Sequence, residues 1–257
     1  MARKREVRFE PAVAKPGSMR SAVSPADDPA DERTIADVEY RGADFAEAHV
    51  HGASFERCLF DSVRFPSTLR QATIAESALR VCDLANVQAD DSSMFETVIE
   101  HGRITGLSWT TGVLRDVAVE STRADLASFA ESRLRSVVFR DCDLRQADFQ
   151  RAEFRNVRFE RCNLTAARFS DARLHQNLRF EDCDLTAVSG LTALRGATIQ
   201  GGDLESLATA LARELGIVVE SGPEPGARSG STVGGYRSDE PLSADEVDRQ
   251  PRSRFGV

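Results

Sequence analysis

The chain of 257 residues contains no apolar run that approaches the ~20 residues needed to cross a lipid bilayer. A basic cluster, Arg3, Lys4 and Arg5, stands near the start of the sequence, but no apolar core follows it. A secretory signal requires such a core, so we expect none here. These absences predict a soluble, cytoplasmic protein that has no membrane partner.

Sequence motifs of catalysis and cofactor binding are missing as well. The chain has no GxSxG nucleophile motif, no HExxH zinc motif and no glycine-rich phosphate loop. His49 and His51 flank Val50, but no third metal ligand is evident for this pair. We therefore predict that the protein is not an enzyme and has no catalytic residue, no cofactor and no metal site.

The cysteines also lack the CxxC spacing that is typical of redox and zinc motifs. They are Cys58, Cys82, Cys142, Cys162 and Cys183. A metal column or a redox pair is one interpretation, and small buried apolar side chains are the other. Because no histidine accompanies the cysteines, we favour the second interpretation.

What the sequence does contain is a large apolar residue at every fifth position through ten consecutive pentads. These residues are Phe129, Leu134, Phe139, Leu144, Phe149, Phe154, Phe159, Leu164, Phe169 and Leu174. A small residue such as alanine, serine, valine or cysteine stands two positions before each of them. A period of five fits neither the helical period of about 3.6 nor the strand period of about two. The sequence therefore predicts an internal repeat.

The repeat extends beyond these ten pentads, with two irregularities. It continues backward in phase to Ile74, and a separate block from Tyr40 to Phe65 is in step with itself. The step from Phe65 to Ile74 is nine positions instead of five, and Pro66 opens this gap, so we expect a projecting loop over residues 66–71. One extra residue follows Leu174 before the pattern resumes.

Several pentads match the pattern A-D/N-L-x-x almost letter for letter. They include Ala43-Asp44-Phe45, Cys142-Asp143-Leu144, Ala147-Asp148-Phe149 and Cys162-Asn163-Leu164. This pattern resembles the pentapeptide-repeat family over about residues 35–204, with departures at Ala89 and Ala124, where a small residue takes the large position. The resemblance implies an all-β fold, a right-handed, four-sided parallel β-helix with one pentad on each side and about 20 residues in each turn.

The sequence supports a repeat of 20 independently of the resemblance. Four aromatic residues are spaced by 20 and would stack inside the solenoid: Trp109, Phe129, Phe149 and Phe169. Opposite charges recur at the same spacing in Asp148 and Arg168, Asp141 and Arg161, Arg140 and Glu160, and Asp125 and Arg145. Adjacent turns would lie about 4.8 Å apart, so these residues are predicted to form ion pairs.

Four segments make up the predicted domain organisation. Residues 1–30 and 218–257 are expected to be disordered tails, because they hold too few large apolar residues to offset the entropy of ordering. Residues 31–204 form the solenoid, and 205–217 form a helix with one apolar stripe that ends near Gly216. This helix caps the last turn, and it also leaves a homodimer through the C-terminal end open.

The resemblance also raises a specific function, because the best-studied family members are acidic DNA mimics that occupy the DNA-binding saddle of DNA gyrase. In some cases they protect gyrase from quinolones or toxins. The net charge of −8 agrees with this role. An acidic patch is predicted between residues 81 and 100, formed by Asp83, Asp90, Asp91, Glu96 and Glu100. Residues 131–180, however, contain eleven arginines and seven acidic residues, a net of +4, which does not fit a DNA mimic.

A basic column is the other candidate binding feature. Arg115, Arg135, Arg155 and His175 are spaced by 20, each directly after a large residue, and they would bind a phosphate or an acidic partner. For this column we favour the other interpretation, a solvated face that is balanced by diagonal acidic residues. We predict a non-enzymatic scaffold that binds another protein through its outer faces, with a modulator of DNA gyrase or another topoisomerase as the alternative and with no direct nucleic-acid binding.

Overall fold

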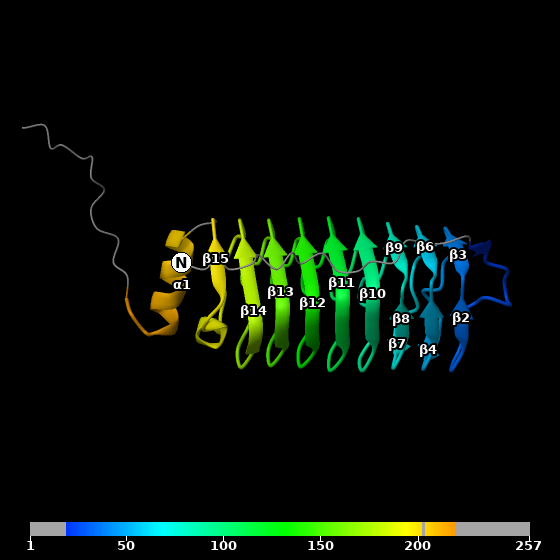
Figure 1. Ribbon diagram of the computed structural model, residues 1–257, viewed down its shortest axis with the longest axis horizontal. Helices are drawn as coiled ribbons and strands as arrows, with labels where there is room; N and C mark the ends of the chain where they lie inside the picture. Colours follow the sequence, from blue (N-terminus) through cyan, green and yellow to red (C-terminus); the bar gives the residue numbers. More distant parts are fainter. Residues whose placement is uncertain (1–18, 202–203, 219–257) are drawn as a thin grey trace, which may run out of the picture. The chain divides into compact units, whose positions relative to one another are not determined.

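The computed structural model describes residues 19–201 and 204–218 (Figure 1). Most of the two tails that the sequence predicts, residues 1–30 and 218–257, therefore lies outside the described residues. The described part is a parallel β-solenoid of about nine turns that is followed by one C-terminal helix, as predicted.

Two long ladders of parallel strands run through the stack. One ladder contains, in order, β1 (Arg20–Ser21), β3 (Val38–Arg41), β6 (Leu59–Asp61), β9 (Ala78–Arg80), β10 (Ser93–Glu100), β11 (Val113–Glu120), β12 (Arg133–Arg140), β13 (Glu153–Glu160), β14 (Arg173–Glu181) and β15 (Thr198–Gln200). The other contains β2 (Thr34–Ala36), β5 (Ser54–Glu56), β8 (Thr73–Ala75) and the first part of β10 to β14. From β10 onward, one long strand therefore serves both ladders.

Shorter pairings close the remaining sides of each turn. Strands β4 (His49–His51) and β7 (Thr68–Arg70) pair with each other. Isolated β-bridges between adjacent turns complete the two sides that the long ladders leave without strands. We number the sides in chain order: the first contains β2, β5, β8 and the start of β10 to β14, and the second contains the end of these long strands. The third side contains the bridges of Asp83, Arg103 and Arg123, and the fourth contains those of Ser108 and Ser128.

The register confirms a repeat of 20 residues in the regular part. Ser93 pairs with Val113, which pairs with Arg133, which pairs with Glu153. On the third side, Arg103 bridges to Arg123 by the same step. Each turn thus lies on the residues of the turn before it, as the charge and aromatic spacing predict.

A left-handed residue turns each corner. In the regular turns the residue two positions after the large residue has a positive φ, as in Glu96, His101, Asp116 and Asp141. Such a conformation is costly for a residue with a side chain. The backbone here is held by the next turn, since the N–H of Asp141 donates to the carbonyl oxygen of Glu160 at 2.9 Å. The hydrogen bonds between turns therefore stabilise corners that a lone pentad would not adopt.

Aromatic rings stack inside the solenoid. The ring centroids of Phe129 and Phe149 are 5.3 Å apart, and those of Phe149 and Phe169 are 5.1 Å apart. Trp109 is buried in the preceding turn, where its backbone N–H donates to the carbonyl oxygen of Ser128 at 2.8 Å. The predicted interior column is confirmed.

The interior also explains two unusual residues near Trp109. Ala89 takes the large position one turn before this indole, so a small residue precedes the largest one. Gly112 stands in a small inward position, and a Cβ added there would lie 2.5 Å from the indole Nε1 and 2.6 Å from the carbonyl oxygen of Ser92. A side chain larger than that of glycine therefore does not fit at this position.

The substitution Gly112→Ala is expected to lower the free energy of unfolding by about 1–3 kcal/mol through overpacking. Urea unfolding measures this loss. The double variant Trp109→Leu/Gly112→Ala is the control, since shortening the indole side chain removes part of the clash. The added loss from alanine in the Trp109→Leu background should be smaller, and an equal loss in both backgrounds would contradict the packing argument.

The projecting loop that the sequence predicts over residues 66–71 is wrong. Strand β7 lies there instead, and Leu69 is a fully buried large residue that pairs with Val50. One pentad is simply a residue short, because only four positions separate Phe65 from Leu69. The large residues of this turn still point into the core, and Pro66 is also buried.

The extra residue after Leu174 is confirmed as a bulge. Phe154 pairs with Leu174, whereas Arg155 pairs with Gln176, so the register shifts by one at His175. A β-bulge accommodates an inserted residue by bending the strand locally. The rest of the turn continues, and Phe159 stacks on Phe180 at 5.1 Å.

The first turn starts earlier than residue 31, where the sequence places it. Strand β1 already pairs with β3, and the guanidinium of Arg20 donates to the carboxylate of Asp27 at 2.6 Å. The hydroxyl of Tyr40 donates to the carbonyl oxygen of Asp27 at 2.5 Å. Residues 20–30 thus belong to the solenoid, because these polar contacts tie them to the open end of the stack.

The other end of the stack carries two helices. The 3₁₀ helix η1 (Leu191–Leu194) fills the gap in the repeat. Helix α1 (Leu204–Glu214) begins one residue before the predicted helix 205–217 and ends three residues before its predicted end. Ala210 of α1 is buried, and Leu207 packs against the core. The C-terminal helix therefore covers part of the last turn.

Candidate protein-binding surface

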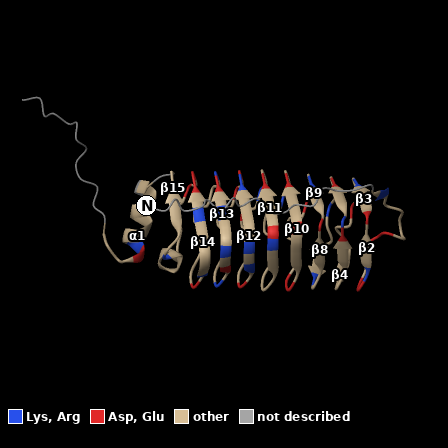
Figure 2. Ribbon diagram, viewed as in Figure 1, with Lys and Arg blue, Asp and Glu red and all other residues tan. Residues whose placement is uncertain are grey.

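Arginines cluster on the first side of the solenoid. In β11 to β14 the residues directly before and after the large inward residue point outward, because side chains alternate along a strand. Five of these outward residues are exposed arginines: Arg115, Arg133, Arg135, Arg155 and Arg173. We call them the arginine face. Figure 2 shows Lys and Arg segments recurring along these strands.

The register places like charges side by side on this face. Arg115 pairs with Arg135, which pairs with Arg155. Neighbouring strands are about 4.8 Å apart, so three guanidinium groups share one row. Such a row repels itself unless an anion lies across it. The geometry therefore favours an acidic or otherwise anionic ligand.

Few acidic groups neutralise the arginine face. Within the described part of the chain, Arg133 and Arg135 form no ion pair. Arg155 donates only to the amide oxygen of Gln176, at 3.4 Å. Arg115 lies 4.6 Å from the centroid of the Phe95 ring and 3.7 Å from the carboxylate of Asp116. Arg173 lies 3.6 Å from the carboxylate of Glu153, which stands between Arg133 and Arg173 in the register. Arg133, Arg135 and Arg155 thus retain donors for a partner.

His175 does not join the row that the sequence predicts. The bulge removes it from the position opposite Arg155, and its Nε2 lies 3.6 Å from the carboxylate of Glu153. Sequence reasoning also missed Arg133 and Arg173 as members of the face. Each of them stands directly before a large inward residue, and side-chain alternation along the strand would have placed both on this face.

The structure does not bring the predicted acidic patch together. Asp83 lies on the third side, Asp90 follows the buried residue of the fourth side, Glu96 turns the next corner, and Glu100 lies on the second side. Asp91 is another corner residue. One turn contains about 20 residues, so a segment of this length surrounds the solenoid instead of forming one surface.

Most of these acidic side chains also form ion pairs or hydrogen bonds within the solenoid. Asp83 pairs with Arg103 at 3.6 Å, and Glu100 pairs with Arg80 at 3.1 Å. Asp90 accepts hydrogen bonds of 2.6 Å from Ser108 and Thr110. Burial opposes ionisation of Asp90, but these hydrogen bonds hold its pKa below the usual value. Neutralised carboxylates do not form the dense row that a DNA mimic requires.

Three of the four predicted ion pairs between turns are confirmed. Asp148 and Arg168 are 2.7 Å apart, Asp141 and Arg161 are 2.7 Å apart, and Arg140 and Glu160 are 2.8 Å apart. The pair of Asp125 with Arg145 is wrong. Arg145 instead contacts Asp143 at 2.7 Å, because these two residues flank the inward Leu144 and both point outward.

Comparison with known proteins identifies the repeat. The family described as pentapeptide repeat region matches residues 100–169 and 132–207. Residues 100–207 of the chain are a pentapeptide-repeat region. No curated protein sequence matches it.

Solved structures of pentapeptide-repeat proteins are similar to the chain at low identity. QnrB1, a plasmid-mediated fluoroquinolone resistance protein, is 18% identical, with coverage of 78% of this chain and 95% of QnrB1 and a TM-score of 0.35. Rfr23 from the cyanobacterium Cyanothece 51142 is 16% identical, covering 49% and 91%, with a TM-score of 0.30. HetL from Nostoc sp. strain PCC 7120 is 15% identical, covering 68% and 88%, with a TM-score of 0.26.

The cysteines of this pentapeptide-repeat protein are free and buried in the small inward positions. The thiol of Cys142 donates to the carbonyl oxygen of Val119 at 3.3 Å, and that of Cys162 donates to Phe139 at 3.4 Å. Burial raises the pKa of Cys82 to about 11, so this thiol stays protonated. Within the described ranges, no group of histidine, cysteine and acidic residues has the arrangement of a metal site.

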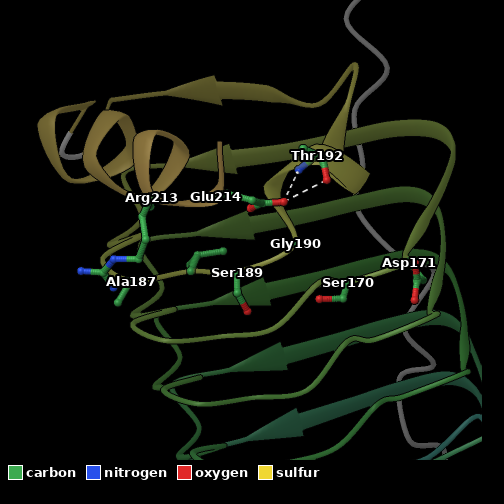
Figure 3. Close-up of a pocket in the computed structure, with 10 residues that line it drawn as sticks. Ser170, Asp171, Ala187, Ser189, Gly190, Thr192, Arg213 and Glu214 are labelled. Atoms are coloured by element: carbon green, nitrogen blue, oxygen red, sulfur yellow. Dashed lines mark hydrogen bonds between the residues drawn. The ribbon is translucent and has the colours of Figure 1, made fainter. Parts of the chain in front are cut away.

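The C-terminal end of the pentapeptide-repeat solenoid carries a groove of about 420 Å³ between α1, η1 and the preceding turn (Figure 3). The carboxylate of Glu214 accepts hydrogen bonds from the backbone N–H groups of Leu191 at 2.7 Å and Thr192 at 3.1 Å. Burial opposes ionisation of Glu214, yet these donors lower its pKa. This contact fastens the end of α1 to η1, so we interpret the groove as a seam between them.

None of the described helices is both long enough and apolar enough to span a membrane.

Proposed function

We propose that this pentapeptide-repeat protein is a non-enzymatic scaffold that binds an acidic segment of another protein through the arginine face. The observation that carries the proposal is the row of Arg115, Arg135 and Arg155, which are exposed and aligned on adjacent strands. A scaffold of stacked turns presents such rows on flat, rigid sides.

The chemistry of arginine determines the class of partner. A guanidinium group forms paired, charge-assisted hydrogen bonds with a carboxylate. A partner segment with several aspartates or glutamates would neutralise the row and remove its internal repulsion. Because the face is exposed, the interaction is screened by salt and should weaken as ionic strength rises.

The alternative, a DNA mimic that modulates DNA gyrase, has less support. The net charge of −8 favours it, but the acidic residues surround the solenoid and pair with arginines. A projecting loop over residues 66–71 would support this role, but β7 occupies its place.

Two further properties belong to this proposal. We place the protein in the cytoplasm, on the grounds of its sequence. We also propose that a homodimer forms through the C-terminal helix, because Leu204, Leu215 and Ile217 leave more than half of their surface exposed at that end.

A charge-reversal experiment tests the arginine face. The variant Arg135→Glu/Arg155→Glu should bind a fluorescently labelled poly-glutamate peptide at least about tenfold more weakly than the unmodified protein. The control variant Arg103→Glu/Arg123→Glu makes the same change in net charge on the third side. Fluorescence anisotropy at two salt concentrations measures both affinities.

The control variant should retain most of the affinity. Equal losses in the two variants would show that net charge alone attracts the peptide, and no binding by the unmodified protein would contradict the proposal. A DNA supercoiling assay separates the alternative. Inhibition of gyrase that is unaffected by Arg135→Glu/Arg155→Glu would favour the DNA mimic.

A further inference from the structure

The second side of the solenoid carries apolar residues that point outward. Leu59, Ala78, Val98, Ala118 and Val138 pair in register across β6, β9, β10, β11 and β12. Val98 stands between the inward residues Thr97 and Ile99, so it faces away from the interior. Ala78, Val98 and Ala118 accordingly form a cluster separate from the core, with Leu59 packed against them. We call these five residues the apolar stripe.

The stripe is buried although it faces outward. The exposed fraction is 1% for Ala78, 7% for Val98, 4% for Ala118 and 1% for Val138. Val113 offers a matched comparison, since it is also a valine directly before a large residue but lies on the first side. It is only half-buried. Adjacent strands therefore do not by themselves cover a valine at this position.

Charged residues that border the stripe are covered too. The side chain of Glu160 is 9% exposed and that of Arg140 is 24% exposed, whereas Arg155 on the first side is exposed. Glu160 lies 2.8 Å from Arg140 and 2.8 Å from Arg158. The cover thus extends beyond the stripe toward β13.

The helices of the described part do not provide this cover. Helix η1 packs against β14 and α1, and the strands pack against their neighbours in the stack. The segment that covers the second side is therefore either a part of the chain outside the described residues or another molecule.

We propose that residues 1–18 of the same chain bind over the apolar stripe. The described chain begins one residue before β1, and β1 extends the ladder of the second side next to β3. The preceding residues are therefore attached to the side that needs a cover. Residues 219–257 instead follow α1, at the other end of the stack.

The composition of residues 1–18 fits the apolar stripe. Val7, Phe9 and Val13 supply apolar side chains, and five basic residues against two acidic ones give a net charge of +3. The border of the stripe contains Glu100, Glu120, Glu160 and Glu181, but these carboxylates already form ion pairs with arginines of the same side: Arg80, Arg140, Arg158 and Arg179. Apolar contact, rather than charge, therefore favours the pairing of residues 1–18 with the stripe.

The length is also sufficient. An extended chain spans about 3.3 Å per residue, so 18 residues reach up to about 60 Å. The stripe crosses five adjacent strands, which are about 4.8 Å apart. Fewer than half of the 18 residues are needed to follow it from end to end.

Cysteine labelling tests the proposal. The variant Val138→Cys, with and without residues 2–18, is treated with a maleimide, and mass spectrometry follows modification at position 138. We expect the truncated protein to react at least about tenfold faster, because the cover is lost. Val113→Cys is the matched control and should react at the same rate in both chains. The native cysteines are buried and give the background rate.

Other occupants give different results, and each would overturn the proposal. A rate at position 138 that rises only on dilution points to a second copy of the chain. A rise on removal of residues 219–257 points to the C-terminal segment. A rate that is slow in every variant shows that the side itself buries the stripe, and a fast rate in the full chain shows that the stripe is open.

A peptide in trans separates removal of the cover from damage to the fold. A synthetic peptide of residues 1–18, added to the truncated Val138→Cys protein, should restore slow labelling at position 138. A peptide with Val7 and Phe9 replaced by serine should not, because the apolar contacts are lost. Protection by neither peptide would also overturn the proposal.

Discussion

Replacement of Cys162 by glutamate is expected to prevent stable folding. Cys162 is 2% exposed and lies between the turns of Cys142 and Cys183, so a carboxylate there has no cation within reach of the interior. Burial of an unpaired charge costs several kcal/mol, which is comparable with the whole stability of a domain. Circular dichroism should show a melting transition that is lost or far lower than that of the unmodified protein.

The pH dependence of this variant has a definite sign. Burial disfavours the charged form, so the carboxyl of Cys162→Glu would have a raised pKa in the folded state. Folding then binds a proton, and stability relative to the unmodified protein falls as pH rises. Melting should thus be closer to normal at about pH 5 than at about pH 8.

Cys162→Ala is the control for this prediction. Alanine already occupies many small inward positions, such as Ala147 and Ala167, so this variant should lose no more than about 1–2 kcal/mol. Normal melting of Cys162→Glu at neutral pH would show that position 162 is not an interior position. The same result would contradict the register of the whole stack.

Truncation of Phe149 to alanine is expected to lower the free energy of unfolding by about 3–5 kcal/mol, which is typical of a buried phenylalanine. Its ring is fully buried and stacks between Phe129 and Phe169, at centroid distances of 5.3 and 5.1 Å. It also contacts Phe159 of the same interior at 5.6 Å. The cavity cannot collapse easily, because the backbone on both sides is held by the ladders.

Urea unfolding of two further variants provides the comparison. Phe149→Leu should lose about 1–2 kcal/mol, since leucine fills most of the space and occurs in equivalent positions such as Leu144 and Leu164. Leu126→Ala should have a small effect, because that side chain is 55% exposed. A loss below about 1 kcal/mol for Phe149→Ala would contradict the stacked interior.

Much of the fold could be predicted because the inward contacts depend on one period. The large residues recur by five and the aromatic column recurs by 20, so Phe129 and Phe149 are assigned to one column without coordinates. The ion pair of Asp141 with Arg161 follows from the same step. The regular sequence pattern is therefore sufficient to assign residues to columns in the regular part of the structure.

The failures have local causes. The four-residue pentad between Phe65 and Leu69 breaks the period, so the sequence alone indicates a gap where the structure has a strand. Arg145 had acidic neighbours both along its strand and across the turn, and the sequence cannot rank these two contacts. The acidic residues of 81–100 are close along the chain, but a turn carries them to different sides.

The candidate surface was predicted only in part for the same reason. Arg115, Arg135 and Arg155 follow the period, whereas the bulge at His175 and the contributions of Arg133 and Arg173 depend on which way each side chain points. The period of five does not indicate that the outward valines on the second side are buried. It becomes evident only when equivalent positions on different sides are compared.

The constant step between paired residues has a consequence for how such a chain changes in length. Every regular turn makes the same contacts with the turns above and below it, so a duplication or loss of one entire turn preserves all the pairings outside the junction. A single-residue change has to be absorbed locally, as the short pentad before Leu69 and the bulge at His175 illustrate. Evolution can thus lengthen this protein, and with it the number of charged rows it displays, in whole units without redesigning its interior.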